Sequence, residues 1–554
     1  MANKVKIFAL GGLDEVGKNM YVLEINDDIF VFDAGSKLPE KMMPGIDLII
    51  PKYDYLIENK DRVKAIFISH GHDEVMAALP YIVKDLKTPI YCSNVTIRML
   101  NDTTERLGIK AKFNFKVVGS GDEVKIAGHN VLFYGTTHSV SESLGIAVDT
   151  GDGYVVYSGN FIIDYGALPQ YKSDINLISR LGDRKVLCLL AESLGADKEG
   201  FTSPHHKITS VVEPLFATDN GRLIFSMHAQ NLFMIREVLD LAVKYKRKIL
   251  IYNKKIEALY KNPLNDYAMH SVPQNLFLPV DELNRPGNDN VVIIVTDIGE
   301  RLLHTLSRIA GGGDKNIYVK PNDTFIIANH PLPGLEILQT KTVDDIYRTG
   351  ASVLNIPKKQ VSSMHGHAED LKMLISLLRP KYYMPIMGEY NKLLANAQIA
   401  VSMHAGYNHT NVFVYDNGMI ASFEDGVYKG YAGQVEVGDV MIDGLGIGDV
   451  GSSVLQDRQK LSDDGVVILG ITVDKKSKKI VAGPDVQMRG VIFLKDADDF
   501  VTNLIQLFET TVNEVLERGP ITDEEKVYIR DKIYYFVRRS TGKEPLVLPV
   551  IVEI

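Results

Sequence analysis

Residues 63–75 read VKAIFISHGHDEV, and this stretch is the most informative segment of the chain. The apolar run 63–68 has the length and composition of a buried strand, and it leads directly to His70 and His72. Two histidines one residue apart, in a turn between a strand and a helix, can direct both imidazoles at one cation. Zinc accepts such nitrogen ligands readily. Because the pair alone is a weak signal, two surface histidines remain the competing interpretation.

Polar residues follow other strand-like runs in the same way. Asp33 ends the run IFVFD, His138 follows VLFYGT, and Asn160 follows YVVYSG. In layered α/β folds the sites lie at the ends of strands. These positions therefore favour a metal site at one sheet edge.

Strand-like and helical segments alternate along most of the chain. A helix is expected at Glu74–Leu86, and strands are expected at 5–10, 20–25, 29–33, 63–68, 131–135, 154–158 and 186–190. From about 209 to 354 a second α/β pattern has a helix at Asn231–Lys246 and strands at 222–227, 248–252, 291–296 and 324–329. After 355 the first pattern returns, with helices at Met364–Leu378 and Asn391–Met403. The pattern predicts an α/β protein with an inserted second α/β region.

The C-terminal part has a different character. Residues 430–451 are rich in glycine and poor in helix formers, which predicts a linker. Residues 452–554 predict a small α/β domain with helices at 497–518 and 523–540 and strands at 466–473, 490–494 and 545–553. The closing segment PLVLPVIVEI is apolar on both faces, so it is either a central strand of its own sheet or a surface that extends into a partner.

The segment Gly12–Asn19 nearly matches a phosphate-binding loop. Position 19 is asparagine, however, so the hydroxyl that would hold magnesium is absent. The following residues, MYVLEI, alternate as a strand, whereas the motif requires a helix N-terminus there. We therefore expect a glycine-rich hairpin and no nucleotide cofactor.

The composition is that of a globular protein without a membrane anchor. The 554 residues are 45% hydrophobic and 24% charged, with no apolar run of membrane-spanning length and no signal-peptide pattern at the start. The two cysteines, Cys92 and Cys188, lie in apolar runs, which favours a reduced cytoplasm. The net charge of −9 argues against non-specific coating of nucleic acid but leaves room for a confined basic channel.

Several longer stretches carry a family resemblance. They are ALGGLDEVGKNMYVLE (9–24), DAGSKLPEKMMPGIDLIIPKYDYL (33–56), THSVSESLG (137–145), MHGHAEDLK (364–372), PIMGEY (385–390) and MIDGLGIGDVGSSVLQDR (441–458). Their order resembles the ribonuclease J family, whose fold is a metallo-β-lactamase αββα sandwich with an inserted β-CASP domain and a small C-terminal α/β domain. The resemblance implies a lactamase domain at 1–208 and 355–429, a β-CASP domain at 209–354, a linker at 430–451 and a C-terminal domain at 452–554.

The resemblance also implies an activity and a site. Members of the family mature and degrade bacterial RNA in the cytoplasm, as 5′-to-3′ exonucleases and endonucleases with two zinc ions. Three metal-binding histidines match as His70, His72 and His138. The family's β-CASP acidic residue matches as Glu192, and a histidine that contacts the scissile phosphate matches as His365.

Other ligand positions have changed. The aspartate and the third histidine of the HxHxDH motif fall on Glu74 and Val75, and a late histidine falls on Met387. The aspartate that bridges both metals falls on Asn160. Two dications about 3.5–4 Å apart repel each other and need a shared anion, which a neutral amide cannot supply. We therefore expect at most one zinc per chain, with manganese or magnesium as alternatives and with Glu74 and Asn160 as doubtful ligands.

The segment Ser362–Gly366 is the expected phosphate contact. Small residues before a helix present free N–H groups, so Ser362, Ser363, His365 and Gly366 are expected to contact an RNA phosphate. A helix cap by Ser362 or Ser363 is the alternative. A second phosphate-contacting histidine of the family falls on Val361.

Two functional hypotheses follow from these departures. The first is an RNA-binding subunit with weak or no catalysis, which forms homo-oligomers or pairs with an active ribonuclease J paralogue. The second is a feeble 5′-to-3′ exoribonuclease and endoribonuclease that uses one metal, with Glu74, Glu192 and His365 as catalytic residues. The β-CASP region and the C-terminal domain argue against a hydrolase of small molecules.

Overall fold

The computed structural model describes residues 2–39, 43–218, 221–261, 272–332, 334–444, 446–448, 452–491 and 497–554. The chain forms two compact units, of which the larger comprises Met1–Leu38 and Leu48–Val440 and the smaller Pro39–Asp47 and Met441–Ile554. Within the described ranges, no helix has the length and apolar character needed to cross a membrane.

An eight-stranded sheet forms one half of a sandwich in the larger unit. Its order is β20-β19-β1-β2-β3-β5-β6-β7. Its strands are β1 (Lys4–Gly11), β2 (Met20–Ile25), β3 (Asp28–Phe32), β5 (Val63–Phe67), β6 (Ile90–Cys92), β7 (Phe115–Val117), β19 (Met419–Glu424) and β20 (Val427–Gln434). β1 and β2 pair in antiparallel fashion, with Val5 opposite Ile25. The segment between them is therefore a hairpin connection, as expected, and not a phosphate-binding loop.

A six-stranded sheet packs against the first. Its order is β18-β12-β11-β10-β9-β8. Its strands are β8 (Glu123–Ile126), β9 (His129–Gly135), β10 (Leu144–Asp149), β11 (Tyr154–Tyr157), β12 (Val186–Glu192) and β18 (Tyr382–Ile386). One buried cluster contains Phe32 and Phe67 from the first sheet and Phe133 and Tyr157 from the second, so the core lies between the sheets.

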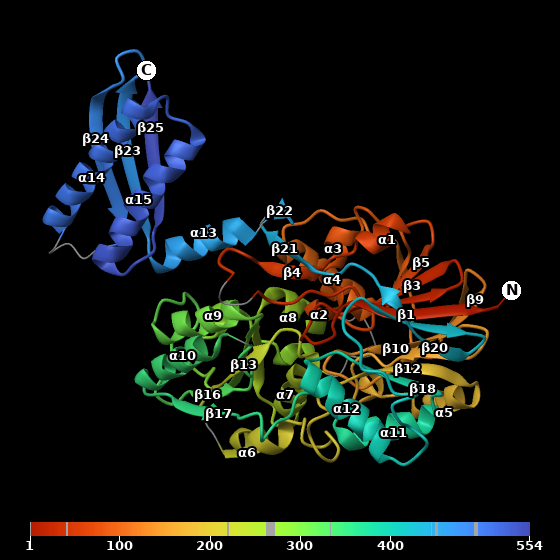
Figure 1. Ribbon diagram of the computed structural model, residues 1–554. Coiled ribbons are helices and arrows are strands. Elements are labelled where there is room, and N and C mark those ends of the chain that lie inside the picture. Colours follow the sequence, from red (N-terminus) through yellow and green to blue (C-terminus); the bar gives the residue numbers. More distant parts are fainter. Residues whose placement is uncertain are drawn as a thin grey trace. The chain divides into compact units, whose positions relative to one another are not determined.

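Helices cover the outer faces of both sheets. In Figure 1, α1, α3 and α4 lie beside the eight-stranded sheet, and α5, α11 and α12 beside the six-stranded one. The helices are α1 (Asp54–Glu58), α2 (Asp73–Met76), α3 (Leu79–Ile82), α4 (Asn94–Arg106), α5 (Ile175–Asp183), α11 (Ala368–Leu378) and α12 (Tyr390–Ser402), and two shorter elements are β4 (Leu48–Pro51) and the 3-10 helix η1 (Pro169–Tyr171). This arrangement is the expected αββα sandwich. It brings the segments after β5, β9 and β11 to one edge.

One helix prediction was wrong. The segment expected as a single helix at Glu74–Leu86 forms two one-turn helices, α2 and α3. Pro80 lies in the first turn of α3. Because proline has no N–H group, it favours the start of a helix and interrupts a helix that would run through it.

The inserted region has a five-stranded sheet of its own, and all of its strand pairs are parallel. The order is β14-β15-β13-β16-β17. The strands are β13 (Leu223–His228), β14 (Lys248–Tyr252), β15 (Val291–Asp297), β16 (Thr324–Ile327) and β17 (Ser352–Asn355). The helices are α6 (Thr209–Thr218), α7 (Leu232–Lys244), α8 (Lys254–Lys261), α9 (Glu300–Ala310) and α10 (Glu336–Arg348), with the 3-10 helices η2 (Gln274–Leu276) and η3 (Val280–Glu282). β13 and β15 are buried along nearly their whole length, which is typical of parallel strands covered on both faces.

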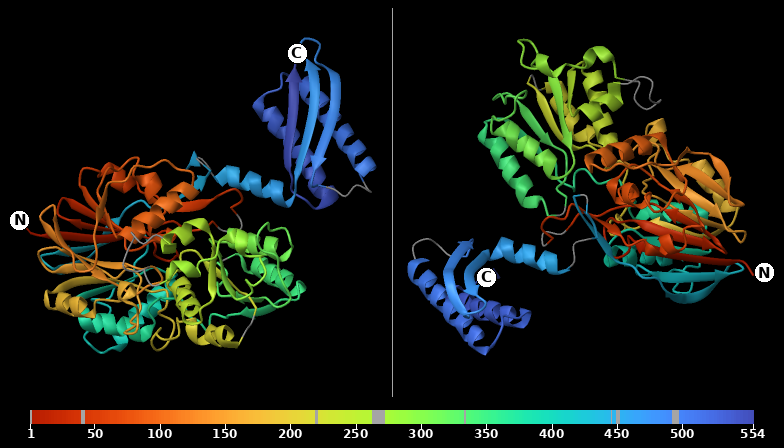
Figure 2. Two further views of the ribbon diagram at one scale, coloured as in Figure 1. Left: turned by 180° about the vertical axis from the view of Figure 1, so that it is seen from behind. Right: turned by 90° about the horizontal axis from the view of Figure 1, so that it is seen from above.

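The smaller unit contains a three-stranded sheet with two long helices on one face (Figure 2). The order is β24-β23-β25, and β25 pairs in parallel with β23. The elements are β22 (Gly446–Ile447), α13 (Ser452–Asp463), β23 (Val466–Asp474), β24 (Lys479–Arg489), α14 (Ala497–Arg518), α15 (Asp523–Thr541) and β25 (Leu546–Glu553). The core lies between sheet and helices and includes Leu504, Ile533 and Val547.

The closing strand is not central, so that interpretation was wrong. β25 lies at the edge of its sheet as described. Its outward side chains Leu548, Val550 and Val552 are 42–49% exposed. The strand is apolar on both faces, yet only one face is buried.

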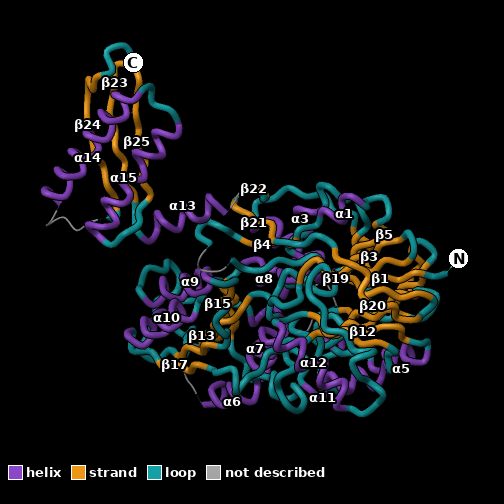
Figure 3. The backbone as a smooth tube through the Cα atoms, viewed as in Figure 1, coloured by secondary structure: helices purple, strands orange, loops and turns teal. Residues whose placement is uncertain are grey.

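The expected linker contains regular structure. β20 extends to Gln434, and β21 (Asp439–Asp443) pairs with β22 (Figure 3). Glycines had indicated an irregular segment, but backbone pairing does not require side chains that favour strands. Most of the strand expected at 490–494 falls outside the described residues. The boundaries expected at 208 and 354 stay predictions.

Candidate metal centre

His70 is positioned by a buried network behind it. Asp33 follows β3, and its carboxylate accepts hydrogen bonds from the Ser69 N–H (2.8 Å) and the Ser69 hydroxyl (3.0 Å). The Ser69 oxygen lies 2.9 Å from Nδ1 of His70. Burial raises the pKa of Asp33 to about 7, against the opposing effect of the hydrogen bonds from Tyr157 and Ser69. Asp33 thus orients a histidine through Ser69, a role that its place at a strand end did not reveal.

Three histidines converge at this edge of the sandwich. The ring centroids of His70, His72 and His138 lie 4.6–5.0 Å apart, and one nitrogen from each lies within 4.8 Å of the others. His138 Nδ1 donates to the Met364 carbonyl at 2.8 Å, so Nε2 carries the free lone pair. Nε2 of His70 and Nε2 of His138 are buried and have no hydrogen-bond partner among the described residues. Two nitrogens are therefore available to a cation.

Burial keeps two of these imidazoles neutral. It lowers the pKa of His70 well below its usual value, and the neighbouring His72 adds to the effect. The pKa of His138 is lowered in the same way by burial and then by His70. Since a metal binds the neutral imidazole, both side chains are in the state that metal coordination needs.

His72 is different because it is paired. Its Nδ1 lies 3.0 Å from Glu74 Oε1, and its Nε2 lies 3.2 Å from the Gln230 carbonyl and 3.2 Å from the Ser139 hydroxyl. Burial opposes a charge on His72, but the Glu74 carboxylate outweighs it and raises the pKa. Burial likewise opposes a charge on Glu74, but His72 outweighs it and lowers the carboxyl pKa to about 2. A metal at His72 must therefore displace a proton from this ion pair.

Asn160 is buried without any partner. The residue follows β11 and is 1% exposed. Neither its Oδ1 nor its Nδ2 has a hydrogen-bond partner in the described part of the chain. An unpaired buried amide is unfavourable by about 1–3 kcal/mol, and such groups are concentrated at functional sites. Its amide oxygen can act as a neutral ligand but brings no negative charge.

Val75 and Met387 offer no imidazole nitrogen to a metal, although the family resemblance places histidines at both positions. Val75 is fully buried in the first turn after His72, and its carbonyl accepts from the Ala34 N–H at 2.8 Å. Met387 belongs to the core between the two sheets, and its N–H points to the Gly12 carbonyl at 3.1 Å and to the Tyr21 hydroxyl at 3.2 Å. Both side chains add apolar packing.

Glu192 and His365 form a second element of the site. Glu192 ends β12 and is fully buried. Its Oε1 accepts from the Phe161 N–H at 2.8 Å and from the Gly366 N–H at 3.2 Å, while Oε2 lies 2.7 Å from His365 Nδ1. The His365 side chain is 20% exposed, and its ring lies 5.4 Å from that of His138. Glu192 thus holds an accessible imidazole beside the three-histidine cluster.

The expected free N–H groups before α11 are mostly occupied. The Ser362 N–H donates to the His205 carbonyl (2.9 Å), the His365 N–H to the Ser363 carbonyl (3.0 Å), and the Gly366 N–H to Glu192. The expectation that Gly366 offers a free N–H to an RNA phosphate is therefore wrong, because Glu192 accepts that N–H. The helix-cap alternative is also wrong for Ser362 and Ser363, because α11 begins at Ala368 with His367 as its N-cap.

Asp370 is a buried residue that sequence reasoning missed. Its carboxylate accepts from the N–H groups of Ile163 (2.8 Å), Thr202 (2.9 Å) and His367 (3.0 Å). It thereby joins the loop after β11, the loop after β12 and the start of α11. An aspartate three residues after an N-cap is a capping pattern and could have indicated part of this role.

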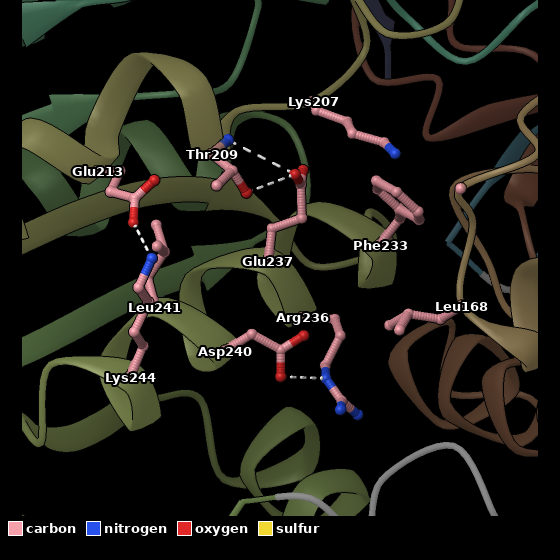
Figure 4. A pocket seen from close by; sticks show the side chains of 11 residues that line it. Leu168, Lys207, Thr209, Glu213, Phe233, Arg236, Glu237, Asp240, Leu241 and Lys244 are labelled. Carbon is pink, nitrogen blue, oxygen red and sulfur yellow. Dashed lines mark hydrogen bonds and ion pairs between the residues drawn. The ribbon is translucent and has the colours of Figure 1, made fainter.

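A separate cavity of about 290 Å³ lies beside α7 (Figure 4). Phe233 and Leu168 provide apolar walls. Polar contacts lie along it (Figure 4): Arg236 Nε donates to Asp240 (2.9 Å), Lys244 to Glu213 (2.5 Å), and the Thr209 hydroxyl and N–H both donate to Glu237 (2.7 and 3.5 Å). Since these polar groups already pair with one another, we assign no function to this cavity.

Comparisons with known proteins cover nearly the whole chain. Family models match at residues 13–169 (metallo-beta-lactamase superfamily), 220–346 (ribonuclease J, beta-CASP domain) and 453–554 (ribonuclease J C-terminal domain). The chain is 33% identical over 555 residues to "Ribonuclease J 2" of Staphylococcus aureus strain NCTC 8325, covering 99% of this chain and 98% of that protein. It is 32% identical over 551 residues to "Ribonuclease J 2" of Staphylococcus epidermidis, with the same coverage.

Solved structures share the fold, and one of them is similar over most of this chain. It is described as a protein of unknown function from Enterococcus faecalis V583, and it aligns with a TM-score of 0.52 at 14% identity. The alignment covers 76% of this chain and 100% of that one. At this identity the likeness concerns the fold alone.

Proposed function

The chain belongs to the ribonuclease J family, and we propose that it is an RNA-binding protein of RNA processing that hydrolyses RNA weakly or not at all. The observation that carries the proposal is Asn160. The family resemblance assigns this position to an aspartate that bridges two metals, and here it is a buried amide without a partner. Without that shared negative charge a second dication close to the first is strongly disfavoured.

The residues present fit one metal ion. His70, His72 and His138 offer three nitrogens within 4.8 Å of one another, and two of them are neutral and unpaired. We propose zinc as the ion, because it favours imidazole ligands in a tetrahedral set with one open position. A bound zinc would polarise a phosphoryl oxygen and acidify a water molecule. Asn160 and Glu74 remain weaker candidate ligands, and manganese or magnesium would suit their oxygen atoms better.

We expect at most one tightly bound transition metal per chain. Purified without chelator, the protein should contain about one zinc by elemental analysis. His138→Ala should remove it, because the variant loses one of two unpaired neutral imidazoles. His404→Ala, which alters a histidine outside the cluster, serves as the control. Two zinc ions per natural chain would contradict the single-site proposal.

Hydrolysis tests the proposed function directly. With the bridging charge absent, a leaving oxygen lacks the second Lewis acid, a loss of several kcal/mol in transition-state stabilisation. The natural chain should therefore degrade 5′-monophosphorylated RNA slowly, and His70→Ala should change that rate little. Rates of shortening are measured on end-labelled RNA. Rapid degradation that His70→Ala abolishes would refute the proposal of weak catalysis.

One observation favours the alternative of a feeble 5′-to-3′ exoribonuclease and endoribonuclease. Glu192 and His365 are paired at 2.7 Å beside His138, as an oriented imidazole that can contact a phosphate or move a proton. Ser362 and Ser363, which are also expected to contact an RNA phosphate, precede His365 in the chain. The hydrolysis measurement separates the two functions: in the alternative, His365→Ala and His70→Ala both lower a small but measurable rate.

We further propose that the chain acts within an oligomer, either with itself or with an active ribonuclease J paralogue. The support is the outward face of β25, where Leu548, Val550 and Val552 lie at alternate positions of the strand and are 42–49% exposed. An apolar face of this kind favours a protein partner.

Truncation after residue 451 should give a smaller assembly, measured by light scattering with and without the paralogue. A full-length monomer at micromolar concentration that ignores the paralogue would exclude the subunit role.

A further inference from the structure

Lys198 is a lysine without an ion-pair partner among the described residues. Its side chain is half-buried, and its ammonium group has no hydrogen bond or ion pair within the described ranges. Burial lowers the pKa of Lys198, the Asp197 carboxylate opposes this, and the positive charges of Lys392 and Lys358 lower the pKa further by smaller amounts. Asp197 itself is engaged by Lys392. A half-buried ammonium whose nearby carboxylate is already engaged by another lysine can accept a further anion.

The loop that carries Lys198 is fixed against the candidate phosphate contact. The Lys198 carbonyl accepts from the Ala368 N–H at 3.0 Å, and the Gly200 carbonyl accepts from the Glu369 N–H at 3.0 Å. The Thr202 hydroxyl donates to the His365 carbonyl at 2.6 Å. The loop therefore lies on the start of α11, directly beside His365.

A close approach of backbone to backbone holds the same loop. A Cβ added at Gly195 would lie 2.5 Å from the Gly366 carbonyl oxygen, so only glycine fits at this position. Asp370 accepts from the Thr202 N–H at the other end of the loop. Residues 195–202 are thus anchored at both ends, and their side chains are presented from a rigid support.

The loop also exposes an aromatic ring. Phe201 is 44% exposed, three residues from Lys198. Tyr165 is 68% exposed on the neighbouring loop, which Asp370 ties to the first through Ile163. A single exposed aromatic side chain is common. An exposed ring and an unpaired lysine on one short loop are what proteins use to bind single-stranded nucleic acid, because bases stack on the ring while the cation holds the backbone.

We infer that residues 195–202 form a binding element for single-stranded RNA, in which Lys198 holds a backbone phosphate and Phe201 stacks on a base. The inference deepens the proposed function and rests on it, since it takes RNA as the ligand. The element extends the RNA contact from His365 along the loop, with Tyr165 as a second stacking position.

The test is binding of the full chain to fluorescently labelled single-stranded oligouridine at several salt concentrations. Lys198→Gln should weaken binding and reduce the slope of log affinity against log salt by about 0.7, the value for one phosphate contact on a single strand. Phe201→Leu should weaken binding by about fivefold or more and leave the slope unchanged. Lys198→Arg and Phe201→Tyr should retain most of the affinity, which separates the lost contact from misfolding.

Two control variants accompany this test, and three results would contradict the inference or the proposed function. Lys87→Gln and Tyr347→Leu alter an exposed lysine and an exposed tyrosine elsewhere, and both should bind as the natural chain does. If Lys198→Gln and Phe201→Leu also bind normally, the inference is overturned while RNA binding by the chain stands. If the natural chain binds no RNA, the proposed function itself fails. If Lys198→Gln weakens only the association with a paralogue, the loop is a protein interface and the inference is wrong.

Discussion

Restoring together the four side chains that the family resemblance assigns to the changed metal positions is expected to raise RNA hydrolysis by about a hundredfold or more. The changes are Val75→His, Glu74→Asp, Asn160→Asp and Met387→His. A second metal supplies several kcal/mol of transition-state stabilisation, and each 1.4 kcal/mol is about tenfold in rate. The measurement is the initial rate on 5′-monophosphorylated RNA, together with metal content, which should rise from about one ion to two.

The four changes should act as a unit. Asn160→Asp alone restores the shared charge but leaves the second site without its imidazoles, so a single change should have little effect. Adding His70→Ala to the fourfold variant should remove the gain. If the fourfold variant binds two metals but hydrolyses RNA no faster, the lost ligands do not explain the weak activity.

The substitutions at Val75 and Met387 are expected to lower the stability of the fold. Val75 is fully buried and Met387 is 1% exposed, so an imidazole at either position must fit a filled space. At Val75 the imidazole adds volume, and such overpacking costs about 1–3 kcal/mol in free energy of unfolding. At Met387 the two side chains are similar in size, and the cost is the burial of a polar ring in an apolar core. Thermal unfolding of each variant should therefore be recorded. The pair Asn160→Asp with Met387→His gives a smaller disturbance, and it should still bind more metal than the natural chain.

The second large effect concerns stability, and Arg222→Met is expected to lower the free energy of unfolding by about 3–5 kcal/mol. Arg222 and Asp323 are fully buried in the inserted α/β region. Arg222 Nε lies 2.8 Å from Asp323 Oδ1, and the guanidinium also donates to the Tyr318 carbonyl at 2.6 Å. The substitution leaves a buried carboxylate without its counter-charge. Urea unfolding followed by circular dichroism measures the loss.

A double variant distinguishes the charge effect from packing. Arg222→Met with Asp323→Leu should recover most of the stability, because apolar replacement of both partners of a buried ion pair is often close to neutral. Arg348→Met is the control: it breaks a pair with Asp345 whose side chains are 74% and 42% exposed, and it should change stability by less than about 1 kcal/mol. An equal loss in the single and double variants would mean that shape, not charge, decides this position.

The order of layers could be predicted from the sequence, because strand and helix patterns depend on residues close to one another in the chain. The run VKAIFI before His70 and the alternation of MYVLEI predicted β5 and β2, and both are confirmed. Val75, Asn160 and Met387, which stand where the family resemblance places metal ligands, were also visible, since a residue type is read directly. His138 and His70 were expected to meet at the edge of one sheet; they do meet, but they follow strands of two different sheets, β9 and β5.

Which groups pair with one another depended on the folded arrangement of the chain. Glu74 could be a metal ligand by position, yet its carboxylate is bound to His72. Gly366 was expected to offer its N–H to a phosphate, but Glu192, 174 residues away in the chain, occupies it. β25 was apolar enough to be central, and it is an edge strand. A hydrogen bond or an exposed face depends on what the fold brings within about 3 Å, and a local pattern carries no information about a partner so distant in sequence.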